Sequence, residues 1–250
     1  MLKWLDFKPK KMSLRIWAEA YFNYYIMLKL KRNLYSDSHN LIVKAKVEDM
    51  ALMDPDNRYE KRIMKLDPKS YRTDPLTKDN FDNLIKDLFP WERRKFTKYL
   101  RNGSYGHLSK IRNDMVCCTW VSHGNIDPEV KKALGLEIEL GKNDVWGVDI
   151  IVHPDYRGQG FEFIIFKHTP EYLLPQGVEN VWGAVWIGDK GSLKMHKRVG
   201  FKPIYFHYDK RRFGVRTSTI IPVNKDTVDS INKIAAKYGI DITSIWKDIS

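Results

Sequence analysis

Hydrophobic and polar positions alternate along the second half of the chain in a way that predicts strands and helices in turn. Residues 145–152 form a β-branched, apolar run typical of a buried strand. Residues 161–168 carry apolar side chains around most of a helical surface, which predicts a buried helix. A second buried strand is predicted at 180–186, followed by a helix whose apolar positions run from Leu193 to Phe201. The pattern favours an α/β fold class.

Shorter patterns predict elements on either side of this core. Residues 41–45 form a candidate first strand, and residues 77–100 have helical spacing with an interruption at Pro90. Two antiparallel hairpins are predicted. The first pairs 106–112 with 115–121 around a turn at Asn113–Asp114, and the second pairs 203–208 with 213–220 around 209–212. An amphipathic C-terminal helix is predicted at 225–238.

The turn between the first buried strand and its helix is marked by glycine, in the sequence Arg157-Gly158-Gln159-Gly160. A strand–turn–helix junction leaves several backbone N–H groups unpaired at the helix N-terminus, which is a ready site for phosphate. The segment contains neither the Gly-Lys-Ser/Thr of a P-loop nor a three-glycine dinucleotide fingerprint. A plain connection between strand and helix is the alternative.

The helix after residue 189 has its own start and stop signals. Asp189 is the predicted N-cap, since a short acceptor side chain there can accept from a first-turn N–H. Gly200 follows the last helical turn, where a left-handed cap costs glycine least.

These two segments together resemble the core of the GNAT acyltransferase superfamily. Arg-Gly-x-Gly after a strand ending in Val152-x-Pro154 is similar to that family's pyrophosphate loop. The family commonly shows Asn-x-x-Ser or Asn-x-x-Ala and then Gly-Phe, where this chain has Asp189, Ser192 and Gly200-Phe201. The resemblance implies a central mixed β-sheet with a splayed parallel strand pair, flanked by helices and extended by helical segments at both ends.

The resemblance also implies where an acyl-coenzyme A would bind. The exposed backbone of Ile150 and Val152 would pair with the pantetheine amides like an added strand. Ser192 would lie near the pantetheine or adenosine end. The diphosphate would be held by the loop residues Arg157, Gly158, Gln159, Gly160 and Phe161.

Three residues are candidates for the chemistry, and each has a structural alternative. His196 stands where the family often has the tyrosine that protonates the departing thiolate, and histidine can donate near neutrality; alternatively it is a surface helix residue. Asp149, on the splayed strand, could take the proton of the amine, or could simply face a lysine. Glu162 stands where the family usually has glycine or alanine. Its carboxylate either faces the substrate or indicates a site that no longer binds the cofactor. His123, at a strand end, is a weaker candidate base.

The implied activity is an acyl-CoA-dependent N-acyltransferase that uses acetyl-CoA or another acyl-CoA and no metal. The acceptor would be the primary amine of a small molecule or an amino sugar. Two alternatives stay open: a longer-chain or carrier-protein-dependent acyltransferase at the inner membrane surface, and a non-catalytic module that binds acyl-CoA. Serine-hydrolase and zinc motifs are missing from the sequence.

Charge points to an acidic partner, because the chain has a net charge of +12 and a pI near 9.5. Residues 1–33 contain eight basic and two acidic residues. Residues 10–32 also contain a tyrosine-rich uncharged stretch, which is typical of an interfacial helix or of one packed on the domain. A phosphorylated cofactor or anionic lipid fits this charge, while no nucleic-acid-binding motif is present. Homodimer formation is left open.

Domain organisation follows from these patterns: a basic extension at 1–35, the acyltransferase-like domain at 36–222 and a C-terminal helix and tail at 223–250. The adjacent Cys117 and Cys118 would face opposite sides of a strand, and so few cysteines favour a reducing compartment. The sequence shows no signal peptide and no long uncharged span, so we expect a cytoplasmic protein. Peripheral contact with the inner membrane surface, through residues 10–32, is an additional expectation.

Overall fold

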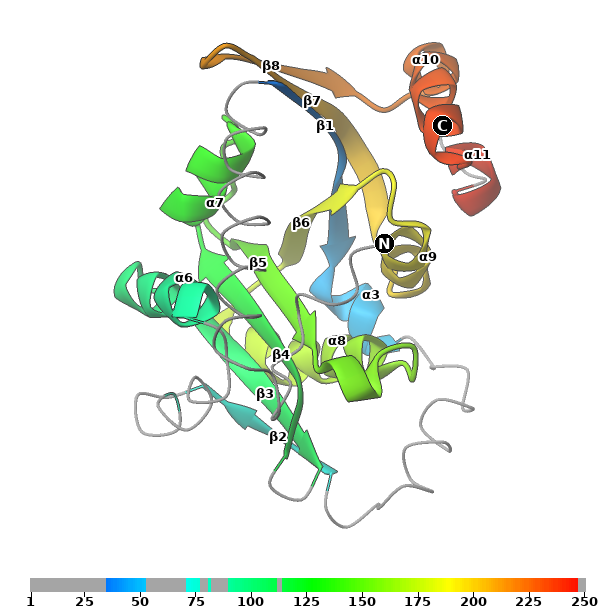
Figure 1. Cartoon of the computed structure of the whole chain (residues 1–250). Coiled ribbons are helices and arrows are strands. Elements are labelled where there is room, and N and C mark those ends of the chain that lie inside the picture. The colour runs from blue at the N-terminus through cyan, green and yellow to red at the C-terminus, as the bar shows by residue number, and fades with distance from the viewer. Residues whose placement is uncertain (1–34, 53–70, 77–80, 82–89, 112–113, 247–250) are drawn as a thin grey trace.

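The computed structural model describes residues 35–52, 71–76, 81, 90–111 and 114–246 (Figure 1). This part of the chain forms one mixed eight-stranded β-sheet with helices on both faces. The predicted α/β fold class is therefore confirmed. The basic segment 1–33 and the part of the predicted helix before Pro90 lie outside the described residues, Phe81 excepted.

The predicted strands and helices that lie within the described residues occur in the predicted order, with further elements between and after them. The strands are β1 (Tyr35–Lys46), β2 (Tyr71–Pro75), β3 (Tyr105–Ile111), β4 (Asp114–His123), β5 (Asp144–Val152), β6 (Asn180–Trp186), β7 (Lys202–Arg212) and β8 (Val215–Pro222). The helices are α3 (Val47–Leu52), α6 (Pro90–Arg101), α7 (Pro128–Leu134), α8 (Phe161–Leu173), α9 (Lys190–Arg198), α10 (Lys225–Ala235) and α11 (Ile242–Ile245). Short 3₁₀ turns cover Pro154–Tyr156, Leu174–Gln176 and Ala236–Tyr238.

The strand order in the sheet is β2-β3-β4-β5-β6-β1-β7-β8. The predicted strand at 41–45 belongs to β1, which lies between β6 and β7 and pairs with both in antiparallel register. Leu41, for example, lies opposite Val185 on one side and Phe206 on the other. Of the neighbouring strand pairs, β5 and β6 alone run parallel in the described part of the chain.

β5 and β6 pair over three residues only and then diverge. Asp144, Val145 and Trp146 pair with residues 180–182, and no pairing of these two strands continues beyond them. β5 has an irregularity at the same level, because Trp120 of β4 lies opposite Asp149 while the next β4 residue lies opposite Gly147. The extra β5 residue forms a bulge, which bends the strand and increases its twist. The predicted splayed pair is thus present, and its gap opens toward the C-terminal ends of both strands.

Asp144 links β5 to β6 at the end of the gap where the two strands still pair. Its carboxylate accepts hydrogen bonds from Asn180 Nδ2 (2.7 Å), Trp182 Nε1 (2.8 Å) and the N–H of Gly141 (3.1 Å). Burial acts to raise the pKa of Asp144, but these three donors outweigh it and hold the pKa below its ordinary value. The carboxylate therefore ties β5 to β6 just before they separate.

Asp144→Asn is expected to lower the free energy of unfolding at pH 7 by about 1–3 kcal/mol, because an amide N–H₂ then faces buried donors. Since the folded-state pKa is depressed, the carboxylate's contribution is complete above the unfolded value of about 3.9 and is lost as pH falls through the folded value. Denaturant titrations of both proteins from pH 7 to 3 should therefore converge at acid pH. Equal stabilities at pH 7 would contradict the role assigned to Asp144.

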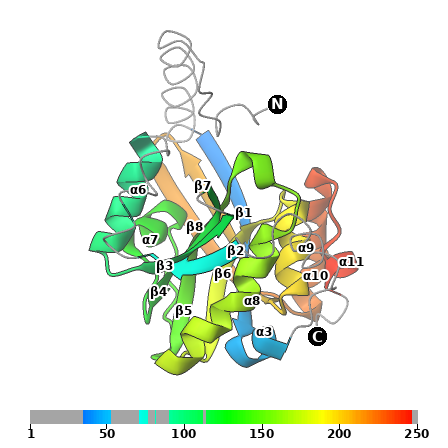
Figure 2. The ribbon, with the colours of Figure 1, turned by 90° about the horizontal axis from the view of Figure 1, so that it is seen from below.

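Helices cover both faces of the sheet (Figure 2). Clusters of buried hydrophobic side chains pack between these helices and the sheet. On one face α8, α9 and α10 contribute Phe163, Leu193 and Ile231 to a cluster with the odd-numbered side chains of β1. On the other face α6 contributes Phe96, which packs against Trp120 with ring centroids 5.2 Å apart. Burial of this much apolar surface is the main favourable term in folding.

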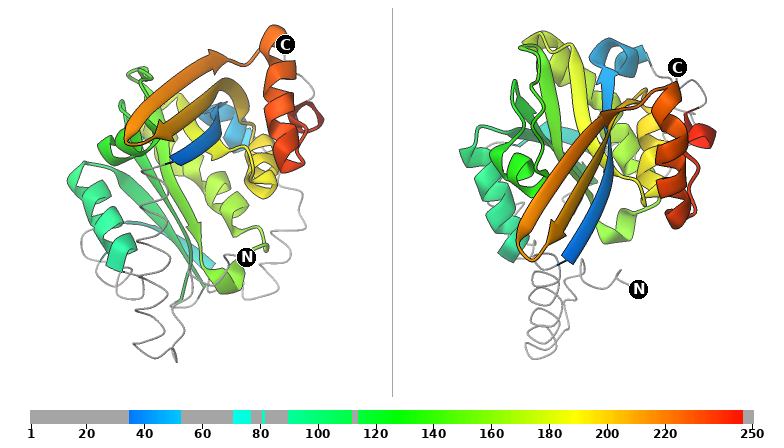
Figure 3. Two further views of the ribbon diagram at one scale, coloured as in Figure 1. Left: turned by 45° about the horizontal axis from the view of Figure 1, so that its top comes forward. Right: turned by 90° about the horizontal axis from the view of Figure 1, so that it is seen from above.

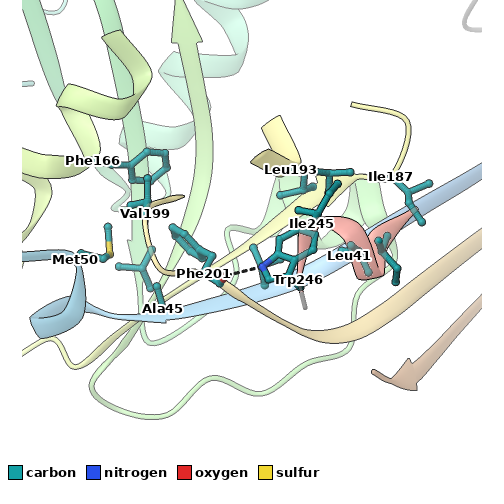
Figure 4. Close-up of a cluster of buried hydrophobic side chains, with 14 of the residues drawn as sticks. Leu41, Ala45, Met50, Phe166, Ile187, Leu193, Val199, Phe201, Ile245 and Trp246 are labelled. Carbon is teal, nitrogen blue, oxygen red and sulfur yellow. Dashed lines mark hydrogen bonds between the residues drawn. The ribbon is translucent and has the colours of Figure 1, made fainter. Parts of the chain in front are cut away.

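The C-terminal segment packs into the same core as the sheet. Trp246, just after α11, donates its Nε1 hydrogen to the carbonyl oxygen of Phe201 (2.9 Å) and belongs to the same buried cluster as Leu193 and Val199 (Figure 4). The predicted amphipathic helix at 225–238 corresponds to α10 and the 3₁₀ turn after it. Within the described ranges, no helix combines the length and the apolarity needed to cross a bilayer.

The last hairpin differs from its prediction. Its turn is Phe213–Gly214, with φ of 50° and 83°, instead of the charged segment 209–212 (Figure 3). Positive φ at both central residues is the type I′ geometry that suits a two-residue hairpin loop. Asp209 stays in β7 because its buried carboxylate pairs with Arg216 of β8. The ion pair lets charged residues extend the strand.

The two cysteines lie on opposite faces of β4, as predicted. Cys117 packs in a cluster with Phe161 and Ile165, and Cys118 packs on the other face with Trp120. Both are buried free thiols.

Candidate functional site

The glycine turn joins β5 to α8. β5 ends at Val152, a 3₁₀ turn covers Pro154–Tyr156, and α8 begins at Phe161. Gly158 and Gly160 have φ of 72° and 88°, in the left-handed region that other residues rarely adopt. The backbone path of the turn therefore requires glycine at both positions.

The turn presents backbone donors. In the described part of the chain, the N–H groups of Gly158, Gly160 and Glu162 have no protein acceptor. Arg157 is exposed beside them, and its Nε donates to the carbonyl oxygen of Val152 (3.2 Å). Convergent N–H groups at a helix N-terminus with an adjacent guanidinium have the chemistry of a phosphate site.

Glu162 does not disrupt these donors, although it lies in the first turn of α8. Its Oε2 is buried and has no hydrogen-bond partner among the described residues. Its charge also acts on Cys117: burial, foremost, and the charges of neighbouring groups including Glu162 raise the pKa of that thiol. The carboxylate therefore lies within electrostatic range of Cys117 in β4.

The splayed edge of β5 offers backbone groups to the gap. The carbonyl oxygen of Asp149 accepts from Thr119 Oγ1 (3.3 Å), and the N–H of His153 donates to Val116 O (2.8 Å), so these odd positions face β4. Because backbone groups alternate along a strand, Ile150 and Val152 direct theirs to the side where β6 has diverged. The two residues predicted to pair with an extended ligand thus line the gap.

Asp149 lies on the face of the sheet that α6 covers. Its carboxylate forms an ion pair with Lys95 of α6. The structural alternative given for Asp149, a strand residue turned toward a lysine, describes this contact. Lys95 itself was not identified from the sequence, because one lysine in an amphipathic helix gives no signal of its partner on a distant strand.

His196 is buried between α8 and α9, so the alternative of a surface residue is wrong. Its ring makes edge contacts with Phe166 and Phe201, at centroid distances of 5.7 and 5.0 Å, and its Nδ1 lies 2.8 Å from Ser192 O. Burial lowers the pKa of His196 to about 4, against a weaker opposing effect of the Ser192 carbonyl. The ring is therefore neutral near pH 7.

Ser192 lies in the first turn of α9. Its N–H donates to Asp189 Oδ1 (2.9 Å), which confirms Asp189 as the N-cap. Its half-buried hydroxyl lies 3.3 Å from His196 Nδ1. Gly200, with φ of 87°, ends the helix in the left-handed conformation predicted for it.

The predicted residues thus lie at several places in the fold. The open edge of β5 leads through the 3₁₀ turn into the glycine turn, an order that suits an extended, phosphorylated ligand. Asp149 lies on the α6 face of β5, and Glu162 lies in the first turn of α8 with its Oε2 buried. His196 and Ser192 belong to α9, while His123 bonds Tyr105 and Gln176 near the opposite end of β5. Among the described residues no cluster of His, Cys, Asp or Glu could hold a metal ion.

A comparison with protein families finds a match over the middle of the chain. Residues 78–201 match the model of the acetyltransferase (GNAT) family, and this segment includes β5, the turn, α8, β6 and α9. An uncharacterized N-acetyltransferase of Methanocaldococcus jannaschii is 23% identical over 223 residues, covering 78% of this chain and 88% of that protein.

Among solved structures, the fold is similar to a GCN5-related glucosamine N-acetyltransferase region of a fungal multi-domain β-N-acetylglucosaminidase. The TM-score is 0.50 with 13% identity, and the match covers 80% of this chain. This chain spans 23% of that longer protein. The likeness concerns the fold.

Proposed function

We propose that this chain, which belongs to the acetyltransferase (GNAT) family, transfers an acyl group, acetyl in the simplest case, from coenzyme A to a primary amine of a small molecule or amino sugar. One observation carries the proposal: the open edge of β5 leads into a turn in which the N–H groups of Gly158 and Gly160 have no acceptor among the described residues. That continuity matches the chemistry of acyl-CoA, in which an amide-bearing arm is joined to a diphosphate.

The residues present fit such a ligand. The backbone groups of Ile150 and Val152 would bond the pantetheine amides, and the N–H groups of residues 157–161 with the Arg157 guanidinium would hold the diphosphate. Ser192 is the proposed contact from α9. The buried position of Glu162 Oε2 supports the fit, because this oxygen does not lie on the solvent-facing surface of the turn.

Acyl-CoA supplies a thioester, whose acyl group is activated toward an amine. The chain has to position the amine, remove its proton and exclude water. Asp149 is our proposed base, since its carboxylate projects from the splayed part of β5. Glu162 is disfavoured as the base because its Oε2 is buried in the first turn of α8. His196 is disfavoured as the proton donor to the thiolate because its ring is not an imidazolium near pH 7.

Isothermal titration with acetyl-CoA tests the proposal. The wild-type chain should bind, and Arg157→Glu should weaken binding about tenfold or more, because the guanidinium is replaced by a charge that repels the diphosphate. Lys233→Glu, the same charge reversal on an exposed position of α10, is the matched control and should bind like wild type. Absence of binding, or equal binding by Arg157→Glu, would refute the proposal.

A further inference from the structure

An ion pair links α6 to the splayed part of β5, where the proposed reaction would take place. Lys95 Nζ contacts Asp149 Oδ2, and the two side chains are 41% and 21% exposed. Lys95 is the more exposed partner, so its ammonium can return to water when another cation takes its place at the carboxylate, which is then not left buried without a counter-charge. A competing cation could therefore replace the lysine at modest cost.

The surroundings of Lys95 Nζ have the chemistry of an ammonium site. The ring centroids of Phe96 and Tyr99 lie 5.5 and 6.0 Å from Nζ, within the range of cation–π attraction. Asp149 Oδ2 is buried, and apart from this ion pair it receives no hydrogen bond from the described residues. A carboxylate and two aromatic rings thus surround one alkylammonium group.

α6 does not need Lys95 to stay attached to the sheet. Phe96 and Tyr99 are 0% and 4% exposed, and both rings pack on Trp120 of β4, at centroid distances of 5.2 and 5.7 Å. These apolar contacts anchor the helix. The attachment of α6 therefore does not depend on the ion pair, which places an ammonium group on Asp149 beside the gap between β5 and β6.

We propose that Lys95 is an internal stand-in for the acceptor: the acceptor is a primary alkylamine, and its ammonium group displaces Lys95 from Asp149. The inference rests on the proposed function and narrows its substrate class to an ammonium carried on a flexible alkyl arm. Lys95 then acts as a competitor that the acceptor must displace.

The proposed reaction transfers the acyl group from the sulfur of coenzyme A to the amine nitrogen. The bound ammonium gives one proton to Asp149, which passes it to water, and the nitrogen lone pair forms the C–N bond to the acyl carbon. The C–S bond breaks, and the second proton released from nitrogen ends on the departing sulfur of coenzyme A. The products are an N-acyl amine and free coenzyme A thiol.

The direct test uses propylammonium, which restores the atoms that Lys95→Ala removes. In thermal denaturation, propylammonium chloride should raise the Tm of Lys95→Ala relative to sodium chloride at the same ionic strength. It should raise the Tm of wild type by less, because the ligand must first displace Lys95 there, and it should not raise the Tm of Lys95→Ala/Asp149→Asn, in which the carboxylate is lost. Equal shifts in all three proteins would overturn the inference.

Kinetics with butylamine as the acceptor gives a second readout. Lys95→Ala should lower the KM for butylamine about threefold to fivefold, the factor that a solvent-accessible ion pair represents. Lys95→Arg keeps the competing cation, and Lys98→Ala removes an exposed lysine one turn along α6; both should retain the wild-type KM.

The outcomes separate the two proposals. If acetyl-CoA binds and butylamine is acetylated but Lys95→Ala raises KM or lowers kcat, Lys95 assists the reaction and the stand-in inference fails while the proposed function stands. If acetyl-CoA does not bind at all, the proposed function fails. In that case the propylammonium experiment still decides whether Asp149 holds an exchangeable ammonium.

Discussion

Asp149→Asn is expected to lower kcat for amine acylation by about 10²–10⁴-fold, the usual contribution of a positioned acid–base group. An amide at this position keeps the size of the side chain but cannot take the proton of the bound amine. The dissociation constant of acetyl-CoA should stay within about twofold of wild type, because the carboxylate lies on the α6 face, away from the turn. Steady-state kinetics and isothermal titration on the same preparations measure both quantities.

Two further variants sharpen this prediction. Asp74→Asn breaks another aspartate–lysine pair, with Lys110, in β2 and β3 at the edge of the sheet, and it should keep wild-type kcat. Glu162→Gln tests the competing base. If Glu162→Gln loses activity while Asp149→Asn retains it, the assignment of the base must be reversed.

Gly158→Asp is expected to weaken acetyl-CoA binding about 100-fold. A Cβ at Gly158 would meet no atom within 4 Å, so the side chain can be accommodated apart from the strain of its positive φ of 72°. The new carboxylate would stand among the N–H groups that are proposed to hold the diphosphate. Two like charges about 4 Å apart near a protein surface repel by up to about 4 kcal/mol, which is enough for this loss.

A matched control isolates the charge from the strain. Gly177, at the far end of α8, has nearly the same φ of 73°, and a Cβ there would likewise meet no atom within 4 Å. Gly177→Asp should therefore share the loss of stability but bind acetyl-CoA like wild type. Equal affinity in the two variants would show that the turn at Gly158 is not the diphosphate site.

Features that depend on short stretches of chain were predicted well. The strand, glycine turn and helix from residue 145 to 173 form as expected, and Asp189 and Gly200 cap α9 at its two ends. Side-chain alternation also placed the adjacent cysteines on opposite faces of β4. Each of these follows from backbone geometry and hydrogen bonding within a few residues.

Local patterns failed where a partner in another element of the fold changed the outcome. The charged run 209–212 is typical of a turn, yet the pairing of Asp209 with Arg216 keeps it in β7. His196 lies among charged neighbours on its helix, yet Phe166 and Phe201 bury its ring. Neither partner could be deduced from the residues next to it.

The order of polar, apolar and glycine positions was thus sufficient to specify the α/β class, most elements and the turn proposed to bind phosphate. The tertiary structure alone decided that β1 enters the sheet between β6 and β7, that Lys95 meets Asp149, and that the Glu162 carboxylate lies near β4. Strand and helix propensities act over a few residues. The choice of a partner far along the chain depends on which arrangement of all the elements buries the most apolar surface while satisfying the polar groups.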